Sequence, residues 1–173
     1  MTADLFTIPS VILIAGTLII PALARTSRMM LAALLPLFAL ISVWNIDQPV
    51  INSWLGLDII VMHATKVGVL FATIFLILTF FGIVFSWANI KKYELAGALL
   101  CSAGAIGVCL SGDFITLFIF WELMAHIRWA VIARQQGERF ATSGEKSLEP
   151  AMTAFIAPQL EWEVMRMTKD WSK

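Results

Sequence analysis

The feature of this sequence best suited to chemistry is a single carboxylate inside an apolar run. Glu122 lies in the run 114–133, which follows the pair Gly112-Asp113. About 20 residues at ~1.5 Å each cover the ~30 Å hydrocarbon core of a bilayer, so Glu122 falls close to the middle of the run. Burial in hydrocarbon favours the protonated form of a carboxyl group. The position therefore predicts a group that takes up and releases a proton within the membrane, as a transport relay requires.

Two nearby residues bear on this prediction. His126 lies four residues after Glu122, on the same face of a helix, and is a candidate relay partner for the carboxylate. Arg128 is nearer the end of the run, and its guanidinium is expected to extend toward the membrane interface. The structural alternative is a protonated Glu122 that hydrogen-bonds a neighbouring helix and only fixes the packing.

The energetics of insertion predict that this helix needs neighbours. An acidic side chain at a helix centre opposes insertion by about 2.5 to 3.5 kcal/mol, whereas each Leu, Ile, Phe or Val favours it by about 0.3 to 0.6 kcal/mol. The apolar side chains of the run return about 3 to 5 kcal/mol in total, which Glu122 and Arg128 together would largely cancel.

The other reactive side chains form no catalytic pattern. Cys101 and Cys109 lie in an apolar run without CxxC spacing or nearby histidines, and we interpret them as packing residues. His63 lies in a polar stretch and is interpreted as a solvated or interfacial histidine. The sequence contains no nucleophile elbow and no phosphate-binding loop. We therefore predict no metal, no cofactor and no catalytic site in this chain.

The composition is that of an integral membrane protein. Hydrophobic residues make up 60% of the 173 residues and charged residues 14%, far from the values of soluble domains. The net charge is zero, so no basic surface predicts a nucleic-acid partner. Half of the charged residues follow Ile132. The chain is therefore predicted to be an all-α membrane bundle over 1–133, followed by a polar cytoplasmic tail over 134–173.

Five apolar runs predict about five membrane-spanning helices. The second run is the shortest, and the first has a signal peptide as its competing interpretation. A polar stretch over 45–66, too poor in apolar residues to span, is expected to lie along the interface. The predicted spans are 5–24, 29–44, 67–87, 95–111 and 114–133.

The fourth span is rich in small residues. Gly97, Gly104 and Gly107 lack side chains, so another helix can approach the backbone closely at these positions. We predict that they form a helix-packing surface.

Basic residues mark every second boundary between the spans. This alternation is followed by Arg25 and Arg28, then Lys91 and Lys92, and then Arg128, Arg134 and Arg139. Because short cytoplasmic loops carry an excess of Lys and Arg, these ends are predicted to be cytoplasmic and the amino terminus to be outside.

The polar tail is predicted to begin as a solvated loop. After Pro158, apolar residues fall on one helical stripe: Leu160, Val164, Met167 and Trp171. Two interpretations stay open for this stretch, a short amphipathic helix on the membrane or a partner, and a disordered tail.

Several runs of this sequence resemble a known family of membrane proteins. They are GAIGV at 104–108, GDFITLF at 112–118, FWEL at 120–123 and GLD at 56–58. Together they resemble the antiporter-like membrane subunits shared by the Mrp-type cation/proton antiporters and by the proton-pumping arm of NADH-quinone oxidoreductase, respiratory complex I. The resemblance covers about residues 1–125. It implies that Glu122 is a proton-relay glutamate, paired in the family with a lysine on a later helix.

The departures from the family shape the functional hypotheses. Family members have about fourteen spanning helices, and the resemblance stops after Ala125, where the chain reads HIRW. The resemblance thus predicts a truncated or frame-shifted homologue, in the inner (plasma) membrane, that carries the carboxylate half of the relay. Its expected partners are the lipid bilayer and other subunits of an antiporter or respiratory complex, to which any oxidoreductase activity would belong. The alternative is a structural or assembly subunit without transport of its own.

Overall fold

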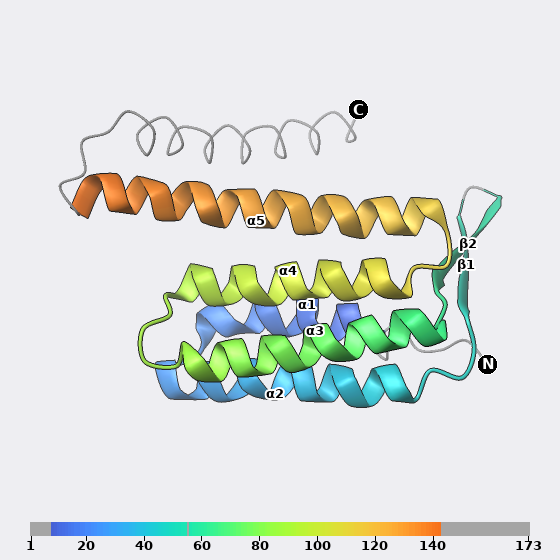
Figure 1. The fold of residues 1–173 in the computed structure, drawn as a ribbon, viewed down its shortest axis with the longest axis horizontal. Helices are drawn as coiled ribbons and strands as arrows, with labels where there is room; N and C mark the ends of the chain where they lie inside the picture. The colour runs from blue at the N-terminus through green and yellow to red at the C-terminus, as the bar shows by residue number, and fades with distance from the viewer. Residues whose placement is uncertain (1–7, 55, 143–173) are drawn as a thin grey trace. The chain divides into compact units, whose positions relative to one another are not determined.

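Helices make up most of the chain in the computed structural model, which describes residues 8–54 and 56–142 (Figure 1). Two compact units divide the chain, Met1–Met124 and Ala125–Lys173, and α5 begins in the first and ends in the second. The elements are α1 (Pro9–Ile19), the 3-10 helix η2 (Ile20–Ala22), α2 (Arg25–Trp44), β1 (Val50–Trp54), β2 (Leu57–Met62), α3 (Lys66–Phe85), α4 (Lys92–Leu110) and α5 (Phe114–Thr142).

Four of the described helices, α2 to α5, are long and apolar enough to cross a membrane. The second predicted span, only 16 residues long, becomes a 20-residue helix because α2 begins at Arg25 and accommodates Pro36 in its interior. The described part of the first span is shorter than expected, since α1 and η2 together cover only Pro9–Ala22. The fold is thus compatible with a membrane protein.

Helices α1 to α4 surround one apolar core in the first unit. The packed pairs are α1 with α2, α2 with α3, α3 with α4, and α4 with α1, so each of these four helices packs against two of the other three (Figure 1). Side chains from all four helices are fully buried between them, among them Leu13, Met29, Leu76 and Leu99. Gly68 of α3 lies against the backbone carbonyl of Cys109 on α4, where a Cβ atom would collide. The start of α3 and the end of α4 are therefore held closely together.

A hydrogen bond between two hydroxyl groups joins α3 to α4. Thr79 Oγ1 lies 2.7 Å from Ser102 Oγ and also donates to the carbonyl of Phe75 at 2.7 Å. Because a hydroxyl group has one proton to donate, Ser102 is the donor to Thr79. The bond satisfies the polar atom of Ser102, whose side chain is buried.

Replacing Ser102 by alanine is expected to lower the free energy of unfolding by about 0.6 kcal/mol, the mean value for hydrogen bonds between membrane helices. The check is a double-mutant cycle with Thr79→Val, measured by reversible unfolding in mixed micelles. A coupling energy near zero would contradict a stabilising role for the bond.

The polar stretch 45–66 contains a β-hairpin, which the all-α prediction omitted. Strands β1 and β2 pair antiparallel, with Trp54 opposite Leu57 and an irregularity between Val50 and Ile51. Gly56 has a φ of +78°, a left-handed conformation that glycine adopts without strain and that tight hairpin turns require. The signal was present in the sequence as β-branched residues on both sides of this glycine.

The helix order places basic residues together at one end of the first unit. We call Arg25, Arg28, Lys91 and Lys92 the basic end. The Arg25 guanidinium donates to the carbonyl of Ala88 in the α3–α4 connection, which brings the two basic connections into contact. The hairpin and the α4–α5 connection lie at the opposite end (Figure 1).

Helix α5 extends beyond its predicted end. We expected a solvated loop from Arg134, but the helix continues to Thr142. Good helix formers (Arg134, Gln135, Gln136, Glu138 and Arg139) carry it past the apolar run despite Gly137. The predicted amphipathic stripe after Pro158 lies outside the described residues.

Candidate functional site

The start of α5 is fixed by Asp113. Its Oδ1 accepts a hydrogen bond from the backbone N–H of Thr116 at 2.7 Å, and its Oδ2 lies 3.3 Å from the Thr116 hydroxyl. The side chain thereby satisfies an N–H group that a helix start leaves without an intrahelical partner. These hydrogen bonds, the backbone one foremost, lower the pKa of the Asp113 carboxyl below its usual value, with the Ile60 backbone contributing as well.

The α4–α5 connection is also attached to β2 through the backbone. Gly112 N donates to the carbonyl of Ile60 at 3.1 Å, and His63 N donates to the carbonyl of Leu110 at 2.7 Å. A Cβ atom on Gly112 would collide with the Ile60 side chain, so glycine is what permits this close approach. The hairpin therefore fixes both the end of α4 and the beginning of α5.

Replacing Asp113 by alanine is expected to cost about 1 kcal/mol of stability through loss of the helix cap. Asp113→Asn is the matched control, because asparagine caps helices equally well and should leave stability nearly unchanged at neutral pH. The check is thermal unfolding in detergent, followed by circular dichroism.

The same residue predicts a pH dependence. Because the folded-state pKa is lowered, the ionised Asp113 stabilises the fold above the unfolded value of about 3.9, and this contribution is lost as the pH falls through the lower folded value. Asp113→Asn should remove that part of the acid sensitivity. An identical acid dependence in both proteins would contradict the assignment.

Helix α5 packs against α4 at two of the predicted glycines. A Cβ atom on Gly104 would lie 2.8 Å from Met124 Cβ and 3.0 Å from the carbonyl oxygen of Phe120, and one on Gly107 would enter the Phe120 ring. The helix that approaches α4 here thus belongs to the same chain. Gly97 is also buried on α4. It lies seven residues, or about two helical turns, before Gly104 and therefore on the same side of the helix.

Glu122 lies on the opposite face of α5 from this contact. It is two residues from both Phe120 and Met124, which corresponds to about 200° of rotation around a helix. The side chain is half-buried, and it lies about 12 Å along the axis from Phe114, where the helix begins. The geometry therefore places a carboxylate inside an apolar helix, on the side that faces away from α4.

The structure places the predicted relay partner in the other unit. His126 is exposed on α5 after Met124, where the second unit begins, and Arg128 is exposed as well. The pairing of Glu122 with His126 stays a prediction, because the two residues belong to different units.

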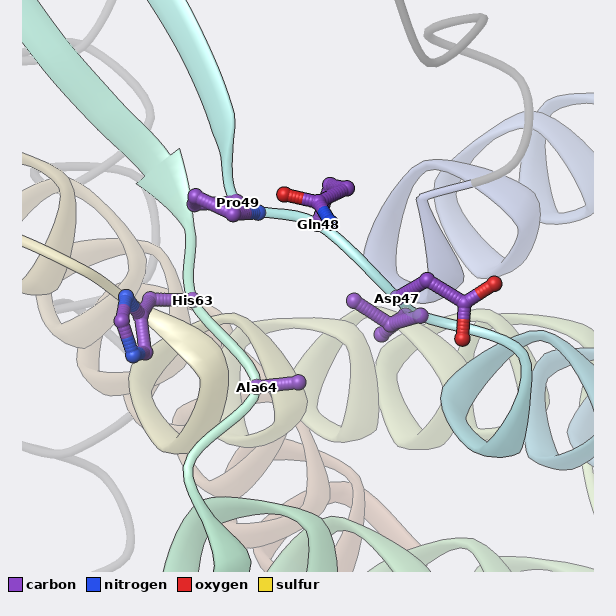
Figure 2. A pocket seen from close by; sticks show the side chains of 6 residues that line it. Asp47, Gln48, Pro49, His63 and Ala64 are labelled. Atoms are coloured by element: carbon purple, nitrogen blue, oxygen red, sulfur yellow. The ribbon is translucent and has the colours of Figure 1, made fainter.

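No cluster of His, Cys, Asp or Glu suited to a metal ion occurs among residues 8–54 and 56–142. A small hollow at the hairpin end contains one acid and one histidine, but Figure 2 shows Asp47 and His63 directed to opposite sides, so they form no acid–base pair. The hollow is lined by Ile46, Asp47, Gln48, Pro49, His63 and Ala64. Cys101 and Cys109 are both half-buried on α4.

Among the described residues, α5 with Glu122 is therefore the candidate functional site. No family model, no curated protein and no solved structure matches this chain.

Proposed function

We propose that this chain is a membrane subunit of the antiporter-like kind, with Glu122 as the carboxylate of a proton relay. The observation that carries the proposal is the position of Glu122, an acidic residue inside an apolar helix and on the face opposite to the α4 contact. Ionisable residues within membrane helices are rare and mark ion or proton pathways.

The surrounding contacts support this role because they fix the position of the carboxylate. Asp113 and β2 fix where α5 begins, and Gly104 and Gly107 hold α5 directly against α4. A relay group works over hydrogen-bonding distances, so its backbone must be positioned to within a fraction of an ångström.

The proposal requires a partner for the relay from outside the described helices. Within residues 8–54 and 56–142, the three lysines stand at helix starts: Lys66 begins α3, Lys91 precedes α4 and Lys92 begins it. None of these is near the middle of a span. The lysine that the family resemblance implies is therefore supplied by another subunit or by a further part of the protein.

Orientation and location belong to the same proposal. The basic end is cytoplasmic, and the hairpin end, with Asp47, Asp58 and Asp113, faces outward. The membrane is the inner (plasma) membrane, in which a proton gradient gives a relay its driving force.

Proton movement by the purified protein together with its accompanying subunits tests the proposal. The tagged full chain, purified with the subunits that accompany it, is placed in liposomes containing a pH-sensitive dye, and a sodium gradient or membrane potential is imposed. We expect a change of internal pH well above that of protein-free liposomes. A rate equal to that background would contradict the proposal.

The structural alternative has its own supporting observation on α3. Exposed apolar side chains recur at seven-residue intervals, typical of helix–helix seams. They are Phe71, Leu78 and Phe85, together with Ile74 and Phe81. In this second candidate function, α3 packs against a partner subunit and the chain transports nothing itself.

Loss of copurifying subunits distinguishes the alternative. Leu78→Ala combined with Phe81→Ala should release the partners if α3 forms the interface, while Ile41→Ala, at a similarly exposed apolar position on α2, should not. Partners retained by both variants would exclude α3 as the interface.

A further inference from the structure

A buried arginine stands at one end of the bundle. Arg28 on the first turn of α2 is only 7% exposed, and it is the one charged residue that is buried in the part of the chain that the structure describes. Within residues 8–54 and 56–142 its side chain takes part in no hydrogen bond or ion pair. The guanidinium nitrogens are not among the buried polar atoms without a partner in the described residues, so the charged end of Arg28 reaches the surface of the bundle, where an anion can bind it.

The groups around Arg28 make this region strongly positive. Arg25 lies three residues earlier and reaches the α3–α4 connection, and Lys91 and Lys92 follow that connection as exposed residues. The Lys91 ammonium lies 6.0 Å from the centre of the Tyr93 ring, on the same turn of the chain. Four cations thus lie at the starts of α2 and α4, and Arg25 joins the start of α2 to the α3–α4 connection.

Only one carboxylate in the described part of this region opposes these charges. Glu94, in the first turn of α4, accepts a hydrogen bond from the backbone N–H of Lys91 at 3.0 Å. This carboxylate serves as part of the helix start. The basic end therefore keeps a net positive charge.

Large apolar side chains border the basic end. Phe85 at the end of α3 is 97% exposed and Leu18 near the end of α1 is 77% exposed. Met30 and Trp87 are also exposed nearby in the sequence, and Trp is characteristic of the membrane interface. A ligand that covers both surfaces must be anionic at one end and apolar at the other.

We propose that the basic end binds the headgroup of an anionic phospholipid, with Arg28 as the principal contact to its phosphodiester. Guanidinium groups bind phosphate oxygens through two parallel hydrogen bonds, which a buried and partly desolvated arginine strengthens. The acyl chains of the same lipid cover Phe85 and its apolar neighbours. A free phosphate ion would neutralise Arg28 but leave these side chains exposed.

Lipid titration of the purified full chain tests this proposal. The protein in a neutral detergent is titrated with phosphatidylglycerol or with phosphatidylcholine, and bound lipid is counted by native mass spectrometry. We expect phosphatidylglycerol to bind more tightly than phosphatidylcholine, and Arg28→Gln to reduce this preference about fivefold, as expected for one basic group near an anionic membrane surface. Equal binding of the two lipids by the unaltered protein would overturn the proposal.

Two further variants keep the test decisive. Lys92→Gln changes an exposed residue of the basic end and should also reduce the preference about fivefold, even where Arg28→Gln fails to fold. Lys66→Gln, at the opposite end, should leave the preference unchanged. A loss with Lys66→Gln equal to that with Lys92→Gln would show general charge attraction and overturn the assigned site. Displacement of the lipid by an equal concentration of inorganic phosphate would overturn its identification as a phospholipid.

Discussion

Replacing Glu122 by glutamine is expected to reduce proton movement in liposomes to the rate of protein-free vesicles. Glutamine has nearly the shape of glutamic acid and can form hydrogen bonds, but it cannot take up and release a proton at the pH of the assay. If Glu122 is the relay carboxylate, no other acidic group in the described part of α5 that crosses the membrane can replace it, because Glu138 lies near the helix end. The measurement is the initial rate of dye response after a gradient is imposed.

The control for this variant is an exposed carboxylate outside the membrane helices. Asp58 on β2 is exposed, and Asp58→Asn removes the same charge without touching α5. It should retain the full rate. Thermal unfolding of Glu122→Gln should match that of the unaltered protein, which separates loss of the relay from loss of the fold. Full proton flux in Glu122→Gln would exclude the relay role.

Replacing Gly107 by leucine is expected to lower stability by about 3 kcal/mol. Even a Cβ atom at this position would enter the Phe120 ring, and leucine adds three more carbon atoms to the same space. Over-packing of this kind typically costs about 1 to 3 kcal/mol, because neighbouring elements must move. Here α5 must move away from α4, so the rate of proton movement should fall together with the unfolding temperature.

Gly82 on α3 is also a glycine within a helix and provides a matched control for Gly107. A Cβ atom on Gly82 would meet nothing within 4 Å, so Gly82→Leu introduces the same side chain into a membrane helix without a collision. It should be neutral or slightly stabilising, since leucine is the better helix former. Equal destabilisation by both variants would show that packing against Phe120 is not the cause. Phe120→Ala combined with Gly107→Leu should recover part of the loss.

The two substitutions together distinguish a chemical role from a positional one. Glu122→Gln should remove function and leave stability unchanged, whereas Gly107→Leu should reduce both. In the structural alternative, Glu122→Gln should leave the fold and the copurifying subunits intact, because glutamine keeps the hydrogen-bonding capacity of the side chain.

The sequence by itself determined the long apolar helices and the place of Glu122 within one of them. Hydropathy reports the free energy of transferring a segment into hydrocarbon, which is a property of the segment alone. The predicted spans 67–87 and 95–111 therefore agree within three residues with α3 and α4, and the predicted start at Phe114 is the start of α5. The proposal of Glu122 as a relay carboxylate likewise began from its place in an apolar run, and it stays a prediction.

Local preference alone did not fix the ends of elements or the hairpin. A loop was expected after Arg134, but the helix continues to Thr142, because polar residues with good helix propensity can extend a helix that is already formed. The hairpin was omitted because its strands are short and contain polar residues such as Asn52 and Asp58. It is attached to the end of α4 and the α4–α5 connection by two backbone hydrogen bonds, from Gly112 N to the Ile60 carbonyl and from His63 N to the Leu110 carbonyl, and these partners are distant in sequence.

Only the tertiary structure decided what the small residues and the charges do. The glycines of α4 predicted a close approach by some helix, and the fold identifies α5 as that helix at Gly104 and Gly107. The same contact orients α5, so that Glu122 lies on the side of α5 that faces away from α4. Likewise, Arg28 was one of several boundary charges in the sequence, but it is buried in the fold. These outcomes depend on which surfaces meet, and a segment's own composition does not contain that information.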